Sequence, residues 1–446
     1  MSLTRHGNIP TANILKEVMS MKATNILAEE FQRQTYRDLL TDIYMDPDRI
    51  DQQTMRYIHA IRTYEQNFGP GEVEIYSAPG RSEIGGNHTD HQHGEVLAAS
   101  INNDAIAIAG RTSDHTVTVI SDGSSALTVD LDDLAQYEDE KGSTAALVRG
   151  VLMGIQERGY TLGGFQAYIT SDVLIGAGLS SSAAFETLIG TVVSGLYNDM
   201  KISPIDIALI GQYAENVYFG KPCGLMDQMA CSVGNLVHID FADPANPVVE
   251  KIECNLEEYD YSLCIVDTKG SHADLTDEYA AIPLEMKKAA SCFGKEVLRD
   301  VSREELFAGL STVRSVAGDR AALRAIHFVE ENERVKQEIA ALRGGDFTGF
   351  LKTVRSSGDS SFKYLQNVYS NQDTRHQNMS IALAASDSIL KENGISRVHG
   401  GGFAGTIQAF VRNSAVPTYK TTMNNIFGEG SCNVLKIRKY GGMKVL

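Results

Sequence analysis

The chain has 446 residues, of which 43% are hydrophobic and 22% charged, a length and balance typical of a globular protein with two or three domains. Its formal net charge of −17 argues against a surface for nucleic acid or for an anionic membrane, but it leaves room for a local anion site. No apolar run reaches the roughly 18 residues that cross a bilayer. The N-terminus lacks an apolar signal segment and the cysteines follow no disulfide pattern, so we expect a cytoplasmic protein.

The predicted elements do not alternate regularly along the chain. Apolar residues at helical spacing predict a helical opening over 23–44. Further on, helices are expected at 144–159 and 379–393. Strands are expected at 71–78, 95–100, 104–110, 115–121, 164–172, 235–241, 260–268, 406–412 and 432–438. This order favours an α+β fold in two lobes over a doubly wound sheet.

A polar, glycine-rich stretch, GRSEIGGNHTDHQHG, covers residues 80–94 and is predicted to be a loop. His88, Asp90, His91 and His93 are residue types that can bind a metal. The histidines lack regular helical spacing, however, and no fourth ligand group is obvious. The alternative interpretation is a pocket in which these side chains hydrogen-bond a polar ligand.

A second stretch, DVLIGAGLSSSAAFETLIGTVVSGLYN (172–198), predicts a strand, a tight glycine loop, three serines and a helix. Such an arrangement directs backbone N–H groups and the positive end of a helix dipole at one point, which suits phosphate. A dinucleotide-binding loop fails at its third glycine, where Ser181 stands, and a Walker A loop fails for lack of its lysine. A glycine turn capped by serine remains the plain structural alternative.

Two further segments carry candidate site residues. Asp227 lies in an apolar context within 214–231, where an unpaired carboxylate is costly, so we expect a cationic partner for it. Glu215 precedes it on a predicted helix. The segment RVHGGGFAGTIQAFV (397–411) has three glycines before a strand, which indicates special backbone conformations or a close approach.

Together these segments resemble the GHMP small-molecule kinases and, among them, the galactokinase family. The similar motifs are APGRSEIGGNHTDHQHG (78–94), GAGLSSSAA (176–184), CGLMDQ (223–228), SHADLTDEY (271–279) and HGGGFAG (399–405), in the family's order. The resemblance implies the two-lobed GHMP fold, with an N-terminal lobe like ribosomal protein S5 domain 2 and a ferredoxin-like C-terminal lobe. It places a helical extension at 1–50, an ATP-binding domain at 51–262 and a C-terminal domain at 263–446.

The resemblance also implies an ATP- and Mg²⁺-dependent sugar 1-kinase, most simply one that phosphorylates galactose. Asp227 and Arg81 would be catalytic, with Arg81 as the cationic partner, and Ser182 and Glu215 would hold Mg²⁺. The residues expected to bind ATP phosphates are Gly176, Gly178, Leu179, Ser180, Ser181 and Ser182. Those expected to bind the sugar are Asn87, His88, Asp90, Gly224 and Tyr279. In this interpretation the histidine-rich stretch is a pocket for sugar hydroxyls.

Several positions depart from the family's pattern. Asn87 stands where the family has a glutamate near the sugar C6 hydroxyl, and His91 stands where it has a tyrosine. Leu174 replaces a proline before the phosphate loop, and AAIPLEMKK replaces an arginine run. A kinase for a related sugar, such as galacturonate or arabinose, is therefore an alternative. A galactose and ATP sensor without activity is a second one, which the intact serines and Asp227 disfavour.

Overall fold

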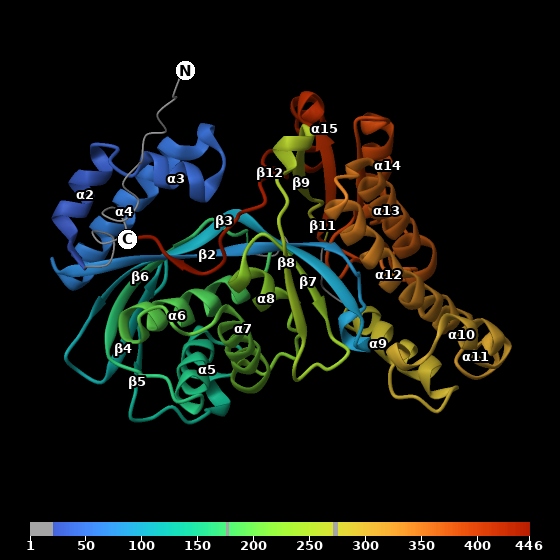
Figure 1. The fold of residues 1–446 in the computed structure, drawn as a ribbon, viewed down its shortest axis with the longest axis horizontal. Coiled ribbons are helices and arrows are strands. Elements are labelled where there is room, and N and C mark those ends of the chain that lie inside the picture. The colour runs from blue at the N-terminus through green and yellow to red at the C-terminus, as the bar shows by residue number, and fades with distance from the viewer. Residues whose placement is uncertain (1–20, 175–177, 271–274) are drawn as a thin grey trace, which may run out of the picture.

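The computed structural model describes residues 21–174, 178–270 and 275–446, and these form two lobes, each built on its own β-sheet (Figure 1). Within the described residues, the larger sheet has nine strands along the order β1-β2-β3-β6-β4-β5, with β7 pairing β3, β8 pairing β7 and β13 pairing β2. Its strands are β1 (Lys22–Ala23), β2 (Glu72–Gly85), β3 (Glu95–Arg111), β4 (Thr116–Ser121), β5 (Leu127–Asp130), β6 (Phe165–Ser171), β7 (Leu236–Asp240), β8 (Val248–Ile252) and β13 (Met443–Lys444).

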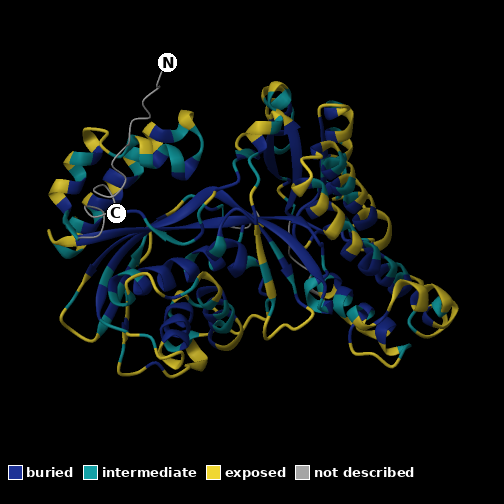
Figure 2. Cartoon of the chain, viewed as in Figure 1, coloured by how far each residue is buried: buried dark blue, intermediate teal, exposed yellow. Residues whose placement is uncertain are grey.

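Helices cover both faces of this larger sheet, and its central strands are almost wholly buried (Figure 2). On one face, Ile75 and Ile108 pack in a core with the N-terminal helices. On the other, Tyr76 and Ala107 pack in a core with the helices that follow β5. Adjacent residues thus point to opposite faces, as strand pleating requires. The helices are α2 (Thr24–Gln32), α3 (Arg37–Tyr44) and α4 (Ile50–Phe68) on the first face, and α5 (Thr144–Glu157), α6 (Ser181–Asn198) and α7 (Pro204–Tyr213) on the second.

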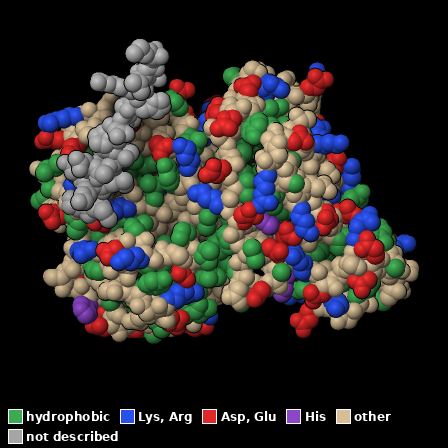
Figure 3. All heavy atoms as spheres, in the orientation of Figure 1, with side chains coloured by type: hydrophobic (Ala, Val, Ile, Leu, Met, Phe, Trp, Pro, Cys, Tyr) green, Lys and Arg blue, Asp and Glu red, His purple; other side chains and the backbone are tan. Residues whose placement is uncertain are grey.

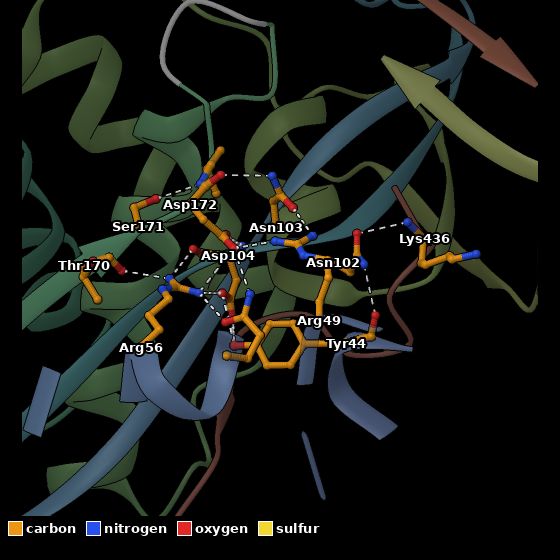
Figure 4. A network of polar contacts seen from close by, with 12 residues as sticks. Tyr44, Arg49, Arg56, Asn102, Asn103, Asp104, Thr170, Ser171, Asp172 and Lys436 are labelled. Carbon is orange, nitrogen blue, oxygen red and sulfur yellow. Dashed lines mark hydrogen bonds and ion pairs between the residues drawn. The ribbon is translucent and has the colours of Figure 1, made fainter. Parts of the chain in front are cut away.

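A polar network fastens the N-terminal helices to the sheet (Figure 4). Arg56 of α4 donates a hydrogen bond to Asp104 Oδ1 at 2.7 Å and lies 3.5 Å from Asp172 Oδ2. Arg49, just before α4, donates to Asp172 at 3.0 Å and to Asn103 at 2.9 Å. Because Asp172 follows β6 directly, these arginines hold the chain where it leaves the sheet toward the serine-rich segment.

The smaller sheet has four antiparallel strands in the order β10-β11-β9-β12 and belongs to the C-terminal lobe. Val335 of α12 and Phe350 of α13 share a core with Leu97 of β3, so the two lobes pack on each other directly. The strands and helices of this lobe are β9 (Tyr261–Asp267), α9 (Thr276–Ser291), α10 (Arg303–Ala308), α11 (Leu310–Val316), α12 (Asp319–Arg343), α13 (Phe347–Ser360), α14 (Asn378–Leu390), β10 (Gly394–Val398), β11 (Thr406–Arg412), α15 (Val416–Phe427) and β12 (Cys432–Leu435).

The predicted α+β architecture in two lobes is confirmed, but two local predictions were wrong. The predicted loop begins in a strand, since β2 continues to Gly85, and the strands expected at 95–100 and 104–110 are one strand, β3. The predicted helical opening is confirmed and consists of two helices, α2 and α3.

On the face seen in Figure 3, acidic and basic side chains are interspersed, and neither kind gathers in one large patch. No helix of the described ranges is long and apolar enough to cross a membrane.

Candidate active site

The serine-rich segment leads into the N-terminus of α6. Gly178 has a φ of +66°, and a Cβ there would lie 3.1 Å from Thr406 Oγ1, so both the backbone conformation and the space favour glycine. Ser180 also adopts the left-handed region, with a φ of +55°, a conformation that tends to occur at functional sites. The first turn of α6 has backbone N–H groups without helical partners and carries the positive end of the helix dipole. Gly176 lies outside the described residues.

Arg81 and Asp227 form the ion pair expected from the sequence. Arg81 Nε and Nη2 donate to the two carboxylate oxygens of Asp227 at 2.6 and 2.8 Å. Arg81 Nη1 donates to the carbonyl oxygen of Gly178, and Ser180 Oγ donates to Asp227 Oδ2. One guanidinium therefore ties together β2, the serine-rich segment and the first turn of α8 (Met226–Val233).

The electrostatics of this pair keep Asp227 ionised. Burial by itself would raise the pKa of its carboxyl, but the Arg81 charge and the hydrogen bonds from Arg81 and Ser180 outweigh it and lower the pKa. The Arg81 guanidinium in turn has its pKa raised by Asp227 despite burial. A fixed negative charge thus lies directly beside the N-terminus of α6.

Ser182 and Glu215, the predicted metal ligands, also meet. Ser182 Oγ donates to Glu215 Oε1 at 3.3 Å, and Lys221 Nζ lies 3.0 Å from the same oxygen. Glu215 belongs to a π-helical turn, Ala214–Phe219, a feature often found at functional sites. A hydroxyl and a carboxylate beside a phosphate-binding helix end are oxygen donors of the kind that Mg²⁺ prefers. The residues present therefore fit a magnesium ion shared with phosphate.

Sequence reasoning missed a buried amide and acid behind Glu215. Gln228 Nε2 donates to Glu215 Oε2 at 2.8 Å and to Glu186 Oε2 at 3.0 Å. Burial, and then the negative charge of Glu215, raise the pKa of Glu186 to about 9. Glu186 is therefore a protonated acid at neutral pH. The sequence around Glu186 does not indicate that it is buried and protonated, because Gln228 and Glu215, which surround it, come from two other helices.

A cavity of about 560 Å³ opens beside the ion pair. Arg81 lines it, together with three of the residues predicted to bind the sugar, His88, Asp90 and Gly224. Gly224 is required here, because a Cβ at this position would collide with the Asp90 carboxylate.

Two histidines of this cavity have lowered pKa values. His88 Nε2 donates to the carbonyl oxygen of Gly401 at 3.0 Å, and burial lowers its pKa. Burial likewise lowers the pKa of His91 to about 4. Among the described residues no group of three or more histidine, cysteine or acidic side chains is placed to hold a metal ion. The cavity is closed on one side by Gly400 and Gly401 of the 397–411 segment, and its lining combines the polar side chains with apolar ones such as Leu225, Met226 and Phe241.

Two of the predicted sugar-binding residues do not line this cavity. The side chain of Asn87 is fully buried behind it, in contact with residues of the C-terminal lobe. Tyr279 lies against the same glycine segment, donates to the carbonyl oxygen of Gly402 at 2.7 Å and packs on Phe403. In contrast, Glu83 lines the cavity, although the sequence analysis did not select it.

Comparison with known proteins agrees with this geometry. The GHMP kinases N-terminal domain model matches residues 146–235, and the galactokinase galactose-binding signature matches residues 62–111. A galactokinase of Glaesserella parasuis is 32% identical over 356 residues, covering 79% of this chain and 89% of the relative. One from Streptomyces coelicolor is 30% identical over 368 residues, covering 82% and 91%. The chain belongs to the galactokinase family.

The fold agrees with that membership, and the family predicted from the motifs is confirmed. The crystal structure of Lactococcus lactis galactokinase complexed with galactose superposes with a TM-score of 0.72 at 24% identity, covering 86% of this chain and 98% of that one. A mevalonate kinase structure superposes with a TM-score of 0.56 over 82% of this chain and 99% of that one, at 16% identity. The two-lobed α+β fold is thus the GHMP kinase fold, and the chain is a sugar kinase that uses ATP.

Proposed function

We propose that this member of the galactokinase family transfers the γ-phosphoryl group of ATP to the C1 hydroxyl of galactose, with Mg²⁺ as its metal. The observation that carries the proposal is the junction made by Arg81. Arg81 lines the cavity, pairs with Asp227 and donates to the backbone of the segment that leads into α6. A sugar in the cavity and a triphosphate at the helix end would meet at this junction.

In this mechanism the chain positions its substrates and neutralises charge, which is most of what phosphoryl transfer needs from a protein. The N–H groups at the start of α6 bind phosphate oxygens, and Ser182 and Glu215 hold the metal. Bound Mg²⁺ would supply charge neutralisation at the phosphates. Lys221, which now pairs with Glu215, would then be free to turn toward the phosphates.

Asp227 orients the sugar. Its carboxylate accepts a hydrogen bond from the C1 hydroxyl and takes the proton as the bond between the C1 oxygen and the γ-phosphorus forms, while the bond from that phosphorus to the bridging oxygen breaks and ADP leaves. Its lowered pKa makes it a weak base, which suits a loose transition state in which the nucleophile needs little activation. Arg81 keeps this carboxylate in place by its bidentate interaction and offsets negative charge on the phosphoryl group during transfer.

The test is an assay of ADP release by the purified protein with ATP, Mg²⁺ and galactose, together with detection of the sugar 1-phosphate. We expect ADP release that depends on galactose and is lost in Asp227→Asn. Binding of galactose and ATP without any turnover would instead identify a sensor and would refute the proposed function.

A further inference from the structure

Glu83 lies on the same strand as Arg81 and points to the same side. The two are separated by one residue in a regularly paired stretch, with Arg81 opposite Ser100 and Glu83 opposite Ala98. Alternate residues of a strand face the same way and are about 6.8 Å apart along it. Both line the cavity.

The Glu83 carboxylate is held by one oxygen only. Oε1 accepts hydrogen bonds from Asn87 Nδ2 at 2.9 Å and from Arg397 Nη2 at 3.1 Å. None of the described residues donates a hydrogen bond to Oε2. The residue is only 4% exposed, yet it lines the cavity, so Oε2 is free to accept a hydrogen bond from a ligand there.

Asn87 fixes the orientation of this carboxylate. Its Oδ1 accepts from Asn367 Nδ2 at 2.9 Å and from Ser361 Oγ at 3.2 Å, so its amide nitrogen must face the other way, toward Glu83 and the carbonyl oxygen of Gly400. The amide can therefore only donate to Glu83. Asn87 acts as a positioning residue behind the cavity, and Glu83 carries the negative charge that a glutamate at position 87 would have carried.

We propose that Glu83 accepts a hydrogen bond from the C6 hydroxyl of the bound sugar and thereby selects a neutral C6 group over a C6 carboxylate. This inference rests on the proposed function, because the C1 end of the sugar is placed by Asp227 and Arg81. A C6 carboxylate would bring a second negative charge against Glu83, and like charges in a partly desolvated site repel strongly. Galacturonate is therefore a poor substrate, in spite of the asparagine at position 87.

The charge state of Glu83 is consistent with this role. Burial raises the pKa of Glu83 to about 7, with Arg397 and Arg81 opposing the rise and Asp90 adding to it. A sugar hydroxyl that donates to the carboxylate would favour its ionised form. Binding of the sugar and ionisation of Glu83 then support each other.

The experiment compares Glu83→Gln with the wild type on galactose and on 6-deoxygalactose, which lacks only the C6 hydroxyl. Loss of a charge-assisted hydrogen bond to the substrate lowers kcat/KM by roughly tenfold or more. We expect kcat/KM for galactose to fall at least about tenfold in the variant, while kcat/KM for 6-deoxygalactose stays within about threefold. The ratio of galactose to galacturonate should fall about tenfold as well.

The matched control is Glu331→Gln. Glu331 is a fully buried carboxylate that accepts a hydrogen bond from the backbone of the same motif, at Gly86 N (3.2 Å), but it does not line the cavity. Its loss should change all three sugars alike. Equal losses on galactose and 6-deoxygalactose in Glu83→Gln would show that Glu83 is only structural and would overturn the inference.

Wild-type measurements keep the inference testable even if Glu83→Gln does not fold. Removing the C6 hydroxyl from the substrate leaves Oε2 without its donor, so the wild type should use 6-deoxygalactose at least about tenfold less well than galactose. Equal use of the two sugars would refute the role of Glu83 and leave the proposed function standing. No turnover on any sugar would instead refute the proposed function.

Discussion

Replacing Asp227 with asparagine separates the catalytic value of the carboxylate from its structural value. The change keeps the side chain's size but leaves the Arg81 guanidinium, which is 9% exposed, without its anion. Removing one partner of a buried ion pair costs about 3–5 kcal/mol. Because the Asp227 side chain is 31% exposed, we expect the lower end of this range, about 3 kcal/mol, in the free energy of unfolding.

The same variant should also lose activity, and this loss should appear in kcat. A positioned acid–base group contributes about 10²–10⁴-fold in rate. We therefore expect kcat in Asp227→Asn to fall by about that factor, with KM for the sugar changing far less, because the cavity walls stay in place. The assay is galactose-dependent ADP release, paired with urea denaturation of the same preparations.

Two further variants make the result decisive. Arg81→Met combined with Asp227→Asn removes the unpaired charge, so stability should recover by about 1–2 kcal/mol while activity stays lost. Asp104→Asn should lower stability without lowering kcat, because Asp104 is a buried, paired carboxylate remote from the cavity. Near-normal turnover in folded Asp227→Asn, or activity that recovers with stability in the double variant, would refute the reasoning.

Three other outcomes follow from the site and the fold. Ser182→Ala and Glu215→Gln should each raise the Mg²⁺ concentration for half-maximal rate, and an unchanged Mg²⁺ titration in both would refute the metal assignment. The pKa of Glu186, about 9 in the folded state against 4.5 for an ordinary glutamate, means that folding takes up a proton between these values. Unfolding free energy should therefore fall as pH rises through this window, by at most about 1.4 kcal/mol per unit, and Glu186→Gln should flatten that slope in denaturation measured from pH 5 to 9. Arg56→Met should cost about 3–5 kcal/mol in urea denaturation, because Asp104 loses one of its two arginines, while the Mg²⁺ requirement and kcat stay as they are.

The architecture could be predicted because the elements that build it carry local signals. The serine- and alanine-rich start of α6 and the isolated apolar strands are visible in a single stretch of sequence. The strand character of residues 80–85 could not be seen in this way. Arg81 and Glu83 line the cavity, so this part of β2 shows polar residues and glycines where a buried strand normally shows apolar ones. Pairing with the distant residues 97–100 makes it a strand.

The candidate site shows the same limit at the level of single side chains. The sequence correctly brings Arg81 to Asp227, since a carboxylate in an apolar context must find a cation. The partners of Glu186 and Gln228 could not be found, because their hydrogen bonds join helices that are distant in sequence. The local sequence can show that a buried charged side chain needs a partner, but which residue is that partner depends on how the helices pack.

Asn87 is the clearest case. Considered alone, an asparagine where the family has a glutamate predicts a site that has lost a negative charge and would admit an acidic sugar. The structure places the amide of Asn87 four residues after a glutamate whose carboxylate it holds, with that carboxylate at the cavity wall. With Glu83 at the C6 end of the sugar, as proposed, the negative charge comes from position 83 instead of position 87. A substrate prediction from position 87 alone then gives the wrong preference at C6, because it leaves out the carboxylate that Asn87 holds.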